Sequence, residues 1–215
     1  GEIKYKKTKE KPKVVESQKK PQMLNFYRDT KQTNLFLGVR AYNLFHEDRY
    51  VAEVIACYLG GMMSSVLFEK VREKLGAAYY VKTYNVSDTD TGCLVTCSGI
   101  DNGKLEKVVS TILREYKKMK SQKMKDEDLK NIKEHLKGKM AIGFENSYSK
   151  AMFFATQELL KNKILKIEDV FRKIDSVTKE DVLRVSKDIF KNENLNLALI
   201  GPNKNNNQLK KILNL

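Results

Sequence analysis

The residues best suited to chemistry in this chain lie in the stretch VREKLGAAYY, residues 71–80. Arg72 stands near the end of a charged, helix-like run, and Tyr79 opens a strand-like segment, with Gly76 as the break between them. Because Gly76 turns the chain, both polar heads can point to the same end of the domain. A guanidinium and a phenol hydroxyl would there provide hydrogen-bond donors for a peptide carbonyl or an oxyanion. A solvated arginine and a half-buried sheet tyrosine are the alternative interpretation.

Other catalytic machinery is sparse. His46 precedes Glu47 and Asp48, a pattern typical of a helix N-terminus, where acidic side chains are favourable. His135 lies among charged residues of a helix-like segment, as an exposed helix residue would. The zinc-protease spacings H-E-x-x-H and H-x-x-E-H are missing, as are the G-x-S-x-G, Walker and G-x-G-x-x-G motifs. We therefore expect no metal ligands and no cofactor site in this chain.

Two pairs of small residues have structural explanations. Cys93 and Cys97 are on one face of a strand-like segment, and small buried thiols on the core side explain them. Gly60 and Gly61 separate two helix-like segments and could cradle a phosphate at a helix N-terminus. That segment lacks the lysine of phosphate-binding loops, and a tight helix–helix corner needs the same glycines. The corner is the favoured interpretation.

Hydrophobic periodicity predicts the elements that would position these residues. A period of two predicts strands, and i, i+3/i+4 spacing predicts amphipathic helices. We expect strands at 22–29, 33–42, 78–87, 92–100 and 194–200, and helices at 47–58, 65–74, 103–120, 126–145, 149–161, 167–174 and 178–190, then a short terminal helix. Strands in adjacent pairs joined by short turns favour a mostly antiparallel or mixed sheet. The expected fold class is α+β, a two-layer sandwich of one sheet against several helices.

Composition indicates a soluble globular protein, because 41% of the 215 residues are hydrophobic and 32% are charged. Residues 1–21 are rich in lysine and predict a linker or flexible arm, and residues 22–215 predict a single domain. No apolar run approaches the roughly 18 residues that a membrane-spanning helix needs. Without a signal-peptide pattern either, a cytoplasmic location is expected, with an organellar or exported parent protein left open. Three cysteines argue against a disulfide framework.

The net charge of +14 makes nucleic acid or an anionic surface a conceivable partner. The lysines are dispersed, however, some of them lie in the N-terminal arm, and no nucleic-acid recognition motif is present. A solvated basic surface is the favoured interpretation.

The stretch from Leu59 to Tyr79 reads L-G-G-x-x-S-S-x-L-F-x-x-V-R-E-K-x-G-x-A-Y. It resembles the signature of the second, non-catalytic homologous domain of the pitrilysin/insulinase-type zinc metallopeptidases. These are the inverzincins, which include the mitochondrial processing peptidases. The resemblance extends over about residues 22–202, where the order of elements and the segments 136–138 and 157–159 are compatible with it.

The resemblance implies two similar α+β domains that face each other across a chamber. The first carries H-x-x-E-H and zinc, and the second supplies an arginine and a tyrosine, at the positions of Arg72 and Tyr79, to the substrate carbonyl or the tetrahedral intermediate at the zinc. The edge of the sheet is implied to help hold an extended peptide by strand addition. Gly60 and Gly61 join Arg72 and Tyr79 as candidate substrate-binding positions.

The same resemblance implies a partner. Without zinc ligands, this chain is expected to be inactive alone and to need a homologous zinc-bearing domain, in the same polypeptide or in a separate subunit. The predicted function is the substrate-binding, non-catalytic half of a zinc metalloendopeptidase that acts on peptides. An inactive structural or assembly domain of the same fold and, less favoured, a basic nucleic-acid-binding domain are the alternative hypotheses.

Overall fold

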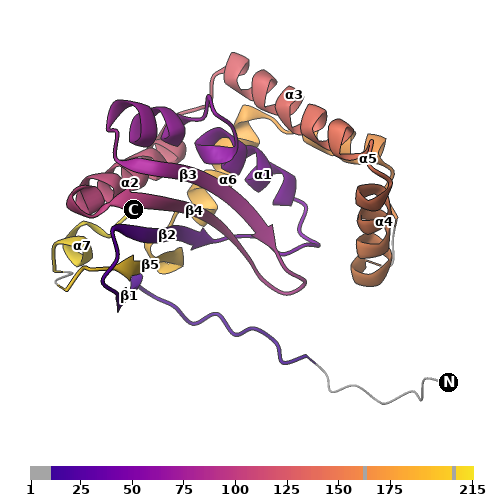
Figure 1. Cartoon of the computed structure of the whole chain (residues 1–215). Coiled ribbons are helices and arrows are strands. Elements are labelled where there is room, and N and C mark those ends of the chain that lie inside the picture. The colour runs from indigo at the N-terminus through magenta and orange to yellow at the C-terminus, as the bar shows by residue number, and fades with distance from the viewer. Residues whose placement is uncertain (1–10, 162–163, 205–206) are drawn as a thin grey trace.

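A five-stranded sheet forms one layer of the protein (Figure 1). The computed structural model describes residues 11–161, 164–204 and 207–215. The order of the strands across the sheet is β1-β5-β2-β4-β3, with bounds β1 (Gln22–Tyr27), β2 (Gln32–Arg40), β3 (Ala78–Ser87), β4 (Gly92–Asp101) and β5 (Leu195–Gly201). β1 and β5 are parallel and the remaining neighbours are antiparallel, which makes the sheet mixed. β3 is an edge strand.

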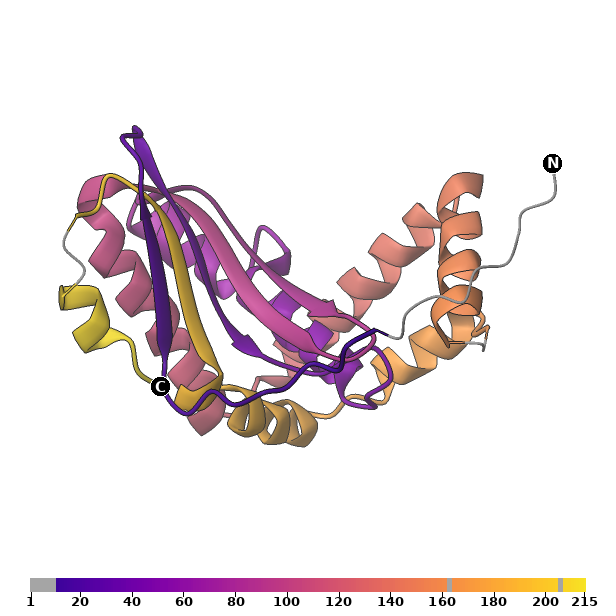
Figure 2. The ribbon, with the colours of Figure 1, turned by 90° about the horizontal axis from the view of Figure 1, so that it is seen from below.

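Helices form the second layer and cover one face of the sheet (Figure 2). α1 (Arg49–Ala56) and α2 (Leu105–Ser121) pack on the strands, and α6 (Lys179–Ile189) packs on both of these helices. The other elements are the π-helical segments η1 (Cys57–Gly61) and η2 (Phe68–Lys74), the helices α3 (Asp126–Gly143), α4 (Ser147–Lys161), α5 (Ile167–Asp175) and α7 (Asn207–Ile212), and the short 3₁₀ turns η3 (Asn102–Lys104) and η4 (Asn192–Asn194). α3 and α4 extend beyond the sheet (Figures 1 and 2). The predicted α+β sandwich is confirmed.

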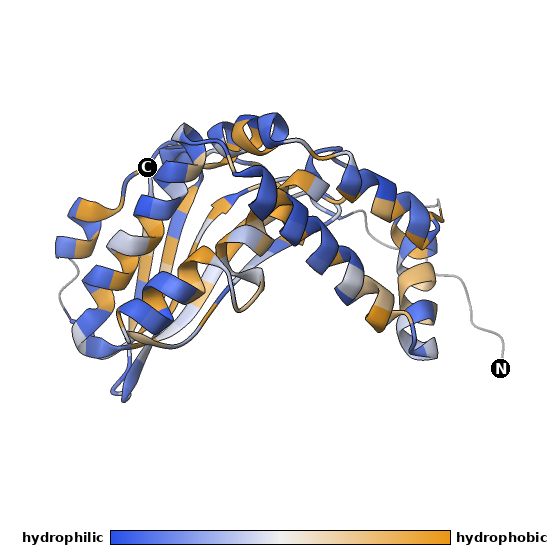
Figure 3. Ribbon diagram, turned by 90° about the horizontal axis from the view of Figure 1, so that it is seen from above, coloured by the Kyte–Doolittle hydropathy of each residue, from blue (hydrophilic) through white to orange (hydrophobic). Residues whose placement is uncertain are grey.

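Apolar residues gather on the sides of the helices that face the sheet, as the hydropathy colouring of α2 illustrates (Figure 3). This is the amphipathic pattern from which the helices were predicted. None of the helices in the described ranges is both long and apolar enough to cross a bilayer.

Strand order differs from the order of the chain. β5, the last strand, lies between β1 and β2, so the two predicted N-terminal strands are not hydrogen-bonded neighbours. The residues of β5 that face the helices are all buried leucines (Leu195, Leu197 and Leu199), as a central strand requires. β1 exposes 72% of Leu24 and 63% of Phe26, which pair with the exposed Ala198 and Ile200 of β5 on the face of the sheet away from the buried leucines.

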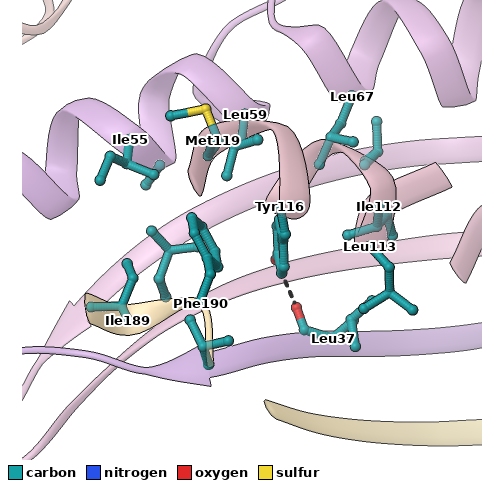
Figure 4. Packing of buried hydrophobic residues seen from close by; sticks show 14 of the residues in the cluster. Leu37, Ile55, Leu59, Leu67, Ile112, Leu113, Tyr116, Met119, Ile189 and Phe190 are labelled. Carbon is teal, nitrogen blue, oxygen red and sulfur yellow. Dashed lines mark hydrogen bonds between the residues drawn. The ribbon is translucent and has the colours of Figure 1, made fainter. Parts of the chain in front are cut away.

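The core centres on two aromatic rings between α2, α6 and the sheet (Figure 4). Tyr116 of α2 and Phe190, which follows α6, stack with their ring centroids 4.5 Å apart, and both are fully buried. Fully buried aromatic side chains of this size are among the largest hydrophobic contributions to stability.

A buried chain of hydrogen bonds ties α2 to the sheet. The Oγ1 atoms of Thr83 (β3) and Thr96 (β4) are 2.9 Å apart, and Thr96 Oγ1 is 2.7 Å from the hydroxyl of Tyr116. That hydroxyl donates in turn to the carbonyl oxygen of Leu37 in β2 at 3.1 Å (Figure 4). Three adjacent strands are thereby connected to one helix inside the core.

Tyr116→Phe is therefore expected to lower the free energy of unfolding by about 1–2 kcal/mol, because it removes a donor from a buried acceptor while it keeps the ring. Equilibrium denaturation in urea measures the change. Tyr148→Phe, which removes an exposed hydroxyl from α4, is the control and should leave the midpoint unchanged. Equal midpoints for Tyr116→Phe and the wild type would contradict this role.

The placement of Cys93 and Cys97 on the core side of their strand is wrong. Thr96 faces α2, so the odd-numbered residues of β4 face the other side of the sheet. Cys97 pairs with Phe36 and Lys82, and 51% of Phe36 is exposed there. Period-two alternation shows which residues share a face of a strand, but it does not show which face the helices cover.

Residues 11–21 run to the sheet without helix or strand structure. Lys11 Nζ lies 2.7 Å from an oxygen of Asp90, and Gln18 Nε2 donates to the carbonyl oxygen of Leu195 at 3.0 Å. The first ten residues of the predicted arm lie outside the described residues. The division into an arm at 1–21 and a domain at 22–215 stays a prediction.

Candidate functional site

A hydrogen-bonded turn joins η2 to the edge strand β3. Gly76 has a φ of +52°, the left-handed conformation that glycine adopts without a steric penalty. Across the turn, the amide of Ala77 donates to the carbonyl oxygen of Val71 at 3.1 Å. Lys104 Nζ donates to the carbonyl oxygen of Gly76 at 3.0 Å. These bonds fix the end of η2 relative to the start of β3, and one candidate donor projects from each.

Arg72 lies in the last turn of η2 with its side chain exposed. Its guanidinium carbon is 4.8 Å from the centroid of the Phe68 ring, which is one turn earlier on the same face. The guanidinium forms no ion pair with any carboxylate in the described part of the chain. Its donors are therefore held above an aromatic ring and remain available to a ligand.

Tyr79 is exposed over 69% of its surface. It sits at an irregularity of the sheet, because Ala78 pairs with Ile100 while Tyr80 pairs with Gly99. Tyr79 is thus the extra residue of a β-bulge, a feature that redirects a side chain out of the regular alternation. Its hydroxyl forms no hydrogen bond with any residue that the structure describes.

The structure places both predicted donors at the same end of the domain, on either side of one turn. No hydrogen bond or ring contact joins Arg72 to Tyr79 within the described residues. Two other tyrosines of β3, Tyr80 and Tyr84, share a pocket with Arg72. The hydroxyl of Tyr80 donates to Asn34 Oδ1 at 3.4 Å, so it is already engaged.

The pocket beside Arg72 has a volume of about 330 Å³ and lies between α1, η1, η2, β3 and α3. We call it the Arg72 pocket. Residues from all these elements line it, among them Gly60, Gly61, Phe68, Arg72, Tyr80 and Lys139. Because β3 is the edge strand, this hollow lies along backbone that has a strand neighbour on one side only.

Gly60 and Gly61 both line this pocket, and the structure gives each a packing reason to be glycine. A Cβ on Gly60 would lie 2.5 Å from Oγ1 and 2.6 Å from the backbone nitrogen of Thr83. A Cβ on Gly61 would lie 3.2 Å from both Cβ and Sγ of Cys57. The close approach of η1 to β3 therefore requires glycine at residue 60, as the interpretation of a tight corner anticipates.

Burial controls the titratable groups at the bottom of the Arg72 pocket. Burial raises the pKa of Glu53, against the opposing effects of the Asn85 amide and of Lys139 and Arg49. Burial, together with the nearby Glu53 charge, raises the pKa of Cys57 to about 11. Cys57 is therefore a neutral thiol at pH 7 and a poor nucleophile.

The His46 segment is a helix start. The His46 ring stacks on Tyr42 with centroids 4.0 Å apart, and its Nδ1 accepts from the amide of Asp48 at 3.0 Å. Asp48 receives two hydrogen bonds from Arg184, at 2.7 and 2.8 Å. Across the described ranges, no three His, Cys, Asp or Glu side chains gather closely enough to hold a metal ion. A zinc ion therefore does not fit the donor sets of these residues.

Sequence reasoning missed Phe68 and Tyr80 as parts of the site. The spacing of Phe68 and Arg72, four residues apart on one helical face, was the available signal for the first. Tyr80 had no such signal, because a regular strand would place it on the face opposite to Tyr79, and only the bulge alters that alternation.

Comparison with known proteins identifies a family. Residues 1–136 match the sequence family described as "Peptidase M16 inactive domain". The uncharacterized zinc protease YmxG of Bacillus subtilis is 33% identical over 178 residues, which are 83% of this chain and 43% of that protein. A second protein of the same organism, named "Probable inactive metalloprotease YmfF", is 30% identical over 162 residues, 75% of this chain and 37% of that protein. The chain thus spans about two fifths of these curated relatives.

Solved structures share the fold. A protease from Helicobacter pylori superposes with a TM-score of 0.78 at 21% identity, over 87% of this chain and 46% of that one. A peptidase M16 inactive domain from Pseudomonas fluorescens superposes with a TM-score of 0.77 at 18% identity, over 89% of this chain and 46% of that one.

Proposed function

This chain belongs to the peptidase M16 family, as its inactive domain, and on that basis we propose that it is the substrate-binding half of a zinc metalloendopeptidase. The resemblance to the second, non-catalytic domain of the pitrilysin/insulinase peptidases is confirmed. The whole enzyme, in this proposal, cleaves peptides with a zinc ion held by a homologous partner domain, and this chain supplies Arg72 and Tyr79 to the substrate.

The observation that carries the proposal is the pair of unengaged donors on one turn. Arg72 and Tyr79 are both exposed, and neither forms an ion pair or a side-chain hydrogen bond with the described residues. Both donors are therefore free to bind a ligand, and the Gly76 turn holds them at the same end of the domain. Donors fixed in advance and directed at a carbonyl oxygen stabilise the negative charge that develops on it during peptide cleavage.

Zinc would supply Lewis-acid polarisation of the peptide carbonyl in the partner domain. The residues of this chain would contribute from the opposite side of the chamber, by binding and orienting the substrate. Arg72 and Tyr79 would donate to the carbonyl oxygen, and Gly60 and Gly61 would keep the adjoining pocket open by bringing η1 close to β3.

The unpaired edge of β3 supports binding of an extended peptide. Edge backbone groups can form a new antiparallel or parallel ladder with a peptide, and pockets beside alternate residues then select its side chains. The Arg72 pocket lies beside residues 80–85 of that edge and is lined by Phe68 and Tyr80, so an apolar side chain of the substrate would fit there.

Assembly of the two domains tests this function directly. We expect the 215-residue chain to release no product from a peptide library, and to gain hydrolysis that EDTA abolishes when it is combined with the zinc-bearing domain encoded upstream or in a neighbouring gene. Hydrolysis by the chain alone would contradict the proposal. A zinc-loaded, folded complex that cleaves no peptide would favour an inactive structural domain, as the name of YmfF describes that relative.

A further inference from the structure

We propose that a second pocket, between α1, α3, α4, α5 and the end of β3, binds the carboxylate of an apolar peptide segment. The pocket has a volume of about 470 Å³. We call it the Lys161 pocket, and its cationic wall consists of Arg49, Lys139 and Lys161. The carboxylate site stands on this geometry, while the peptide as its source rests on the proposed function.

Among the described residues, the cations of this pocket form no close ion pairs, although Lys139 and Arg49 act electrostatically on Glu53. In the described ranges, Arg49, Lys139 and Lys161 form no ion pair with a carboxylate, and neither does the nearby Lys173, whose Nζ lies 5.6 Å from the centroid of the Tyr50 ring. Lys137 of α3, by contrast, is paired with both Glu134 and Asp175, at 2.9 Å each. Positive charge thus accumulates around one hollow.

The one acid in the lining is Glu53, and burial raises its pKa. The pKa of Lys161 is shifted in the opposite direction, downward. Burial first, and then the charges of Arg49 and Lys173, lower the pKa of Lys161 to about 8. A bound anion would remove this repulsion and would receive charge-assisted hydrogen bonds from the same groups.

The remainder of the pocket favours an apolar ligand body over a bare inorganic ion. Its floor and sides are formed by Leu136, Met140, Phe153, Val170 and Ile174. Gln157 does not compete for the ligand, because its amide donates to the carbonyl oxygen of Leu165 at 3.2 Å and accepts from the Leu165 amide at 3.0 Å. These two bonds instead hold α4 against the segment that leads into α5.

Two further features point to a peptide as the source of the carboxylate. The Lys161 pocket and the Arg72 pocket share Glu53, Asn85, Leu136 and Lys139, so they adjoin each other along β3. Asn85 Oδ1, at their junction, is buried and accepts no hydrogen bond from the described residues, and an amide N–H would satisfy it. Tyr80 and Asn85 are separated by roughly 17 Å of extended strand, about the length of five peptide residues.

Calorimetric titration of the 215-residue chain tests the site without zinc or a partner domain. The probes are acetylated trileucine with a free C-terminal carboxylate, the same peptide as its C-terminal amide, and inorganic phosphate. We expect the carboxylate form to bind at least about tenfold more tightly than the amide. Lys161→Met and Arg49→Met should each weaken it about tenfold, because each removes a charge-assisted bond. Lys130→Met, an exposed lysine on α3, is the matched control and should bind like the wild type.

Equal affinity of the acid and amide forms, or unchanged binding by Lys161→Met, would overturn the proposal. Phosphate that binds as tightly as the peptide would overturn the apolar part of it and leave a simple anion site. The titration needs no catalysis, so it is independent of the hydrolysis assay. If the assembled enzyme cleaves peptides but the chain does not bind the carboxylate peptide, only the Lys161 pocket is refuted. If the chain binds the carboxylate peptide but the assembled, zinc-loaded protein cleaves no peptide, the proposed peptidase function is refuted instead.

Lys161→Met is expected to stabilise the chain at pH 7, which separates loss of binding from loss of folding. The folded pKa of about 8 lies below the ordinary value of 10.5, so burying the charged form is unfavourable at neutral pH. Above the folded pKa the unfolded state binds more protons, and this penalty disappears as the pH rises from about 8 to about 10.5. Denaturation midpoints at pH 7 and pH 10.5 measure it. A variant less stable than the wild type at pH 7 would contradict the assigned environment.

Discussion

Arg72→Ala in the proposed two-domain peptidase is expected to lower kcat/KM by about 10²-fold while the zinc content stays unchanged. The guanidinium is held over Phe68 and has no acidic partner in the described residues, so its removal takes away a donor without unbalancing a buried charge. If the donor acts mainly on the charge that develops in the transition state, kcat falls with kcat/KM and KM changes little. Steady-state kinetics on one fluorogenic peptide and metal analysis measure the two quantities.

Tyr79→Phe is the companion variant, because it removes only the hydroxyl of an exposed side chain. If both donors act on one oxygen, the double variant should lose less than the product of the single losses. Arg28→Ala and Tyr148→Phe are matched controls, since both side chains are exposed on other parts of the surface. Wild-type rates for Arg72→Ala and Tyr79→Phe in a zinc-loaded enzyme would contradict the proposed role of these side chains as hydrogen-bond donors to the substrate.

Gly60→Ala is expected to lower the free energy of unfolding by about 2–3 kcal/mol, the largest stability effect among these variants. The new methyl group would meet the backbone nitrogen of Thr83 at 2.6 Å, and the backbone of β3 cannot move aside cheaply because it is paired with β4. The φ of Gly60 is −161°, which any residue adopts, so the cost is one of space and not of backbone conformation. Urea denaturation measures it.

Two other glycines calibrate this prediction. The Cβ of Gly61→Ala would lie 3.2 Å from Cβ and Sγ of Cys57 and 3.6 Å from the carbonyl oxygen of Ala56, so the change should cost much less. Gly138→Ala lies inside α3 with no atom within 4 Å of the new Cβ, and should stabilise by up to about 1 kcal/mol through helix propensity. If Gly60→Ala were as stable as Gly138→Ala, the close approach of η1 to β3 would be disproved.

Local signals in the chain predict the elements well. The Thr178 capping box is one example, because the side chain of Thr178 accepts from the amide of Asp181 at 3.1 Å where α6 begins. β3 spans residues 78–87 as the period-two pattern predicts. The positions of Arg72 and Tyr79 on either side of Gly76 follow from the same kind of evidence, since helix ends, turns and strand starts depend on neighbouring residues.

The strand order, the face on which each side chain lies, the bulge and the pockets depend on interactions between distant residues, and no local pattern encodes them. The placement of β5 between β1 and β2 depends on pairing residues more than 150 positions apart. Cys97 faces away from the helices because α2 packs on the face of β4 that carries Thr96. The bulge that sets Tyr79 apart from Tyr80 exists only through the register with β4. The Arg72 and Lys161 pockets likewise arise where elements meet, because a hollow is a property of packed surfaces and not of any one segment.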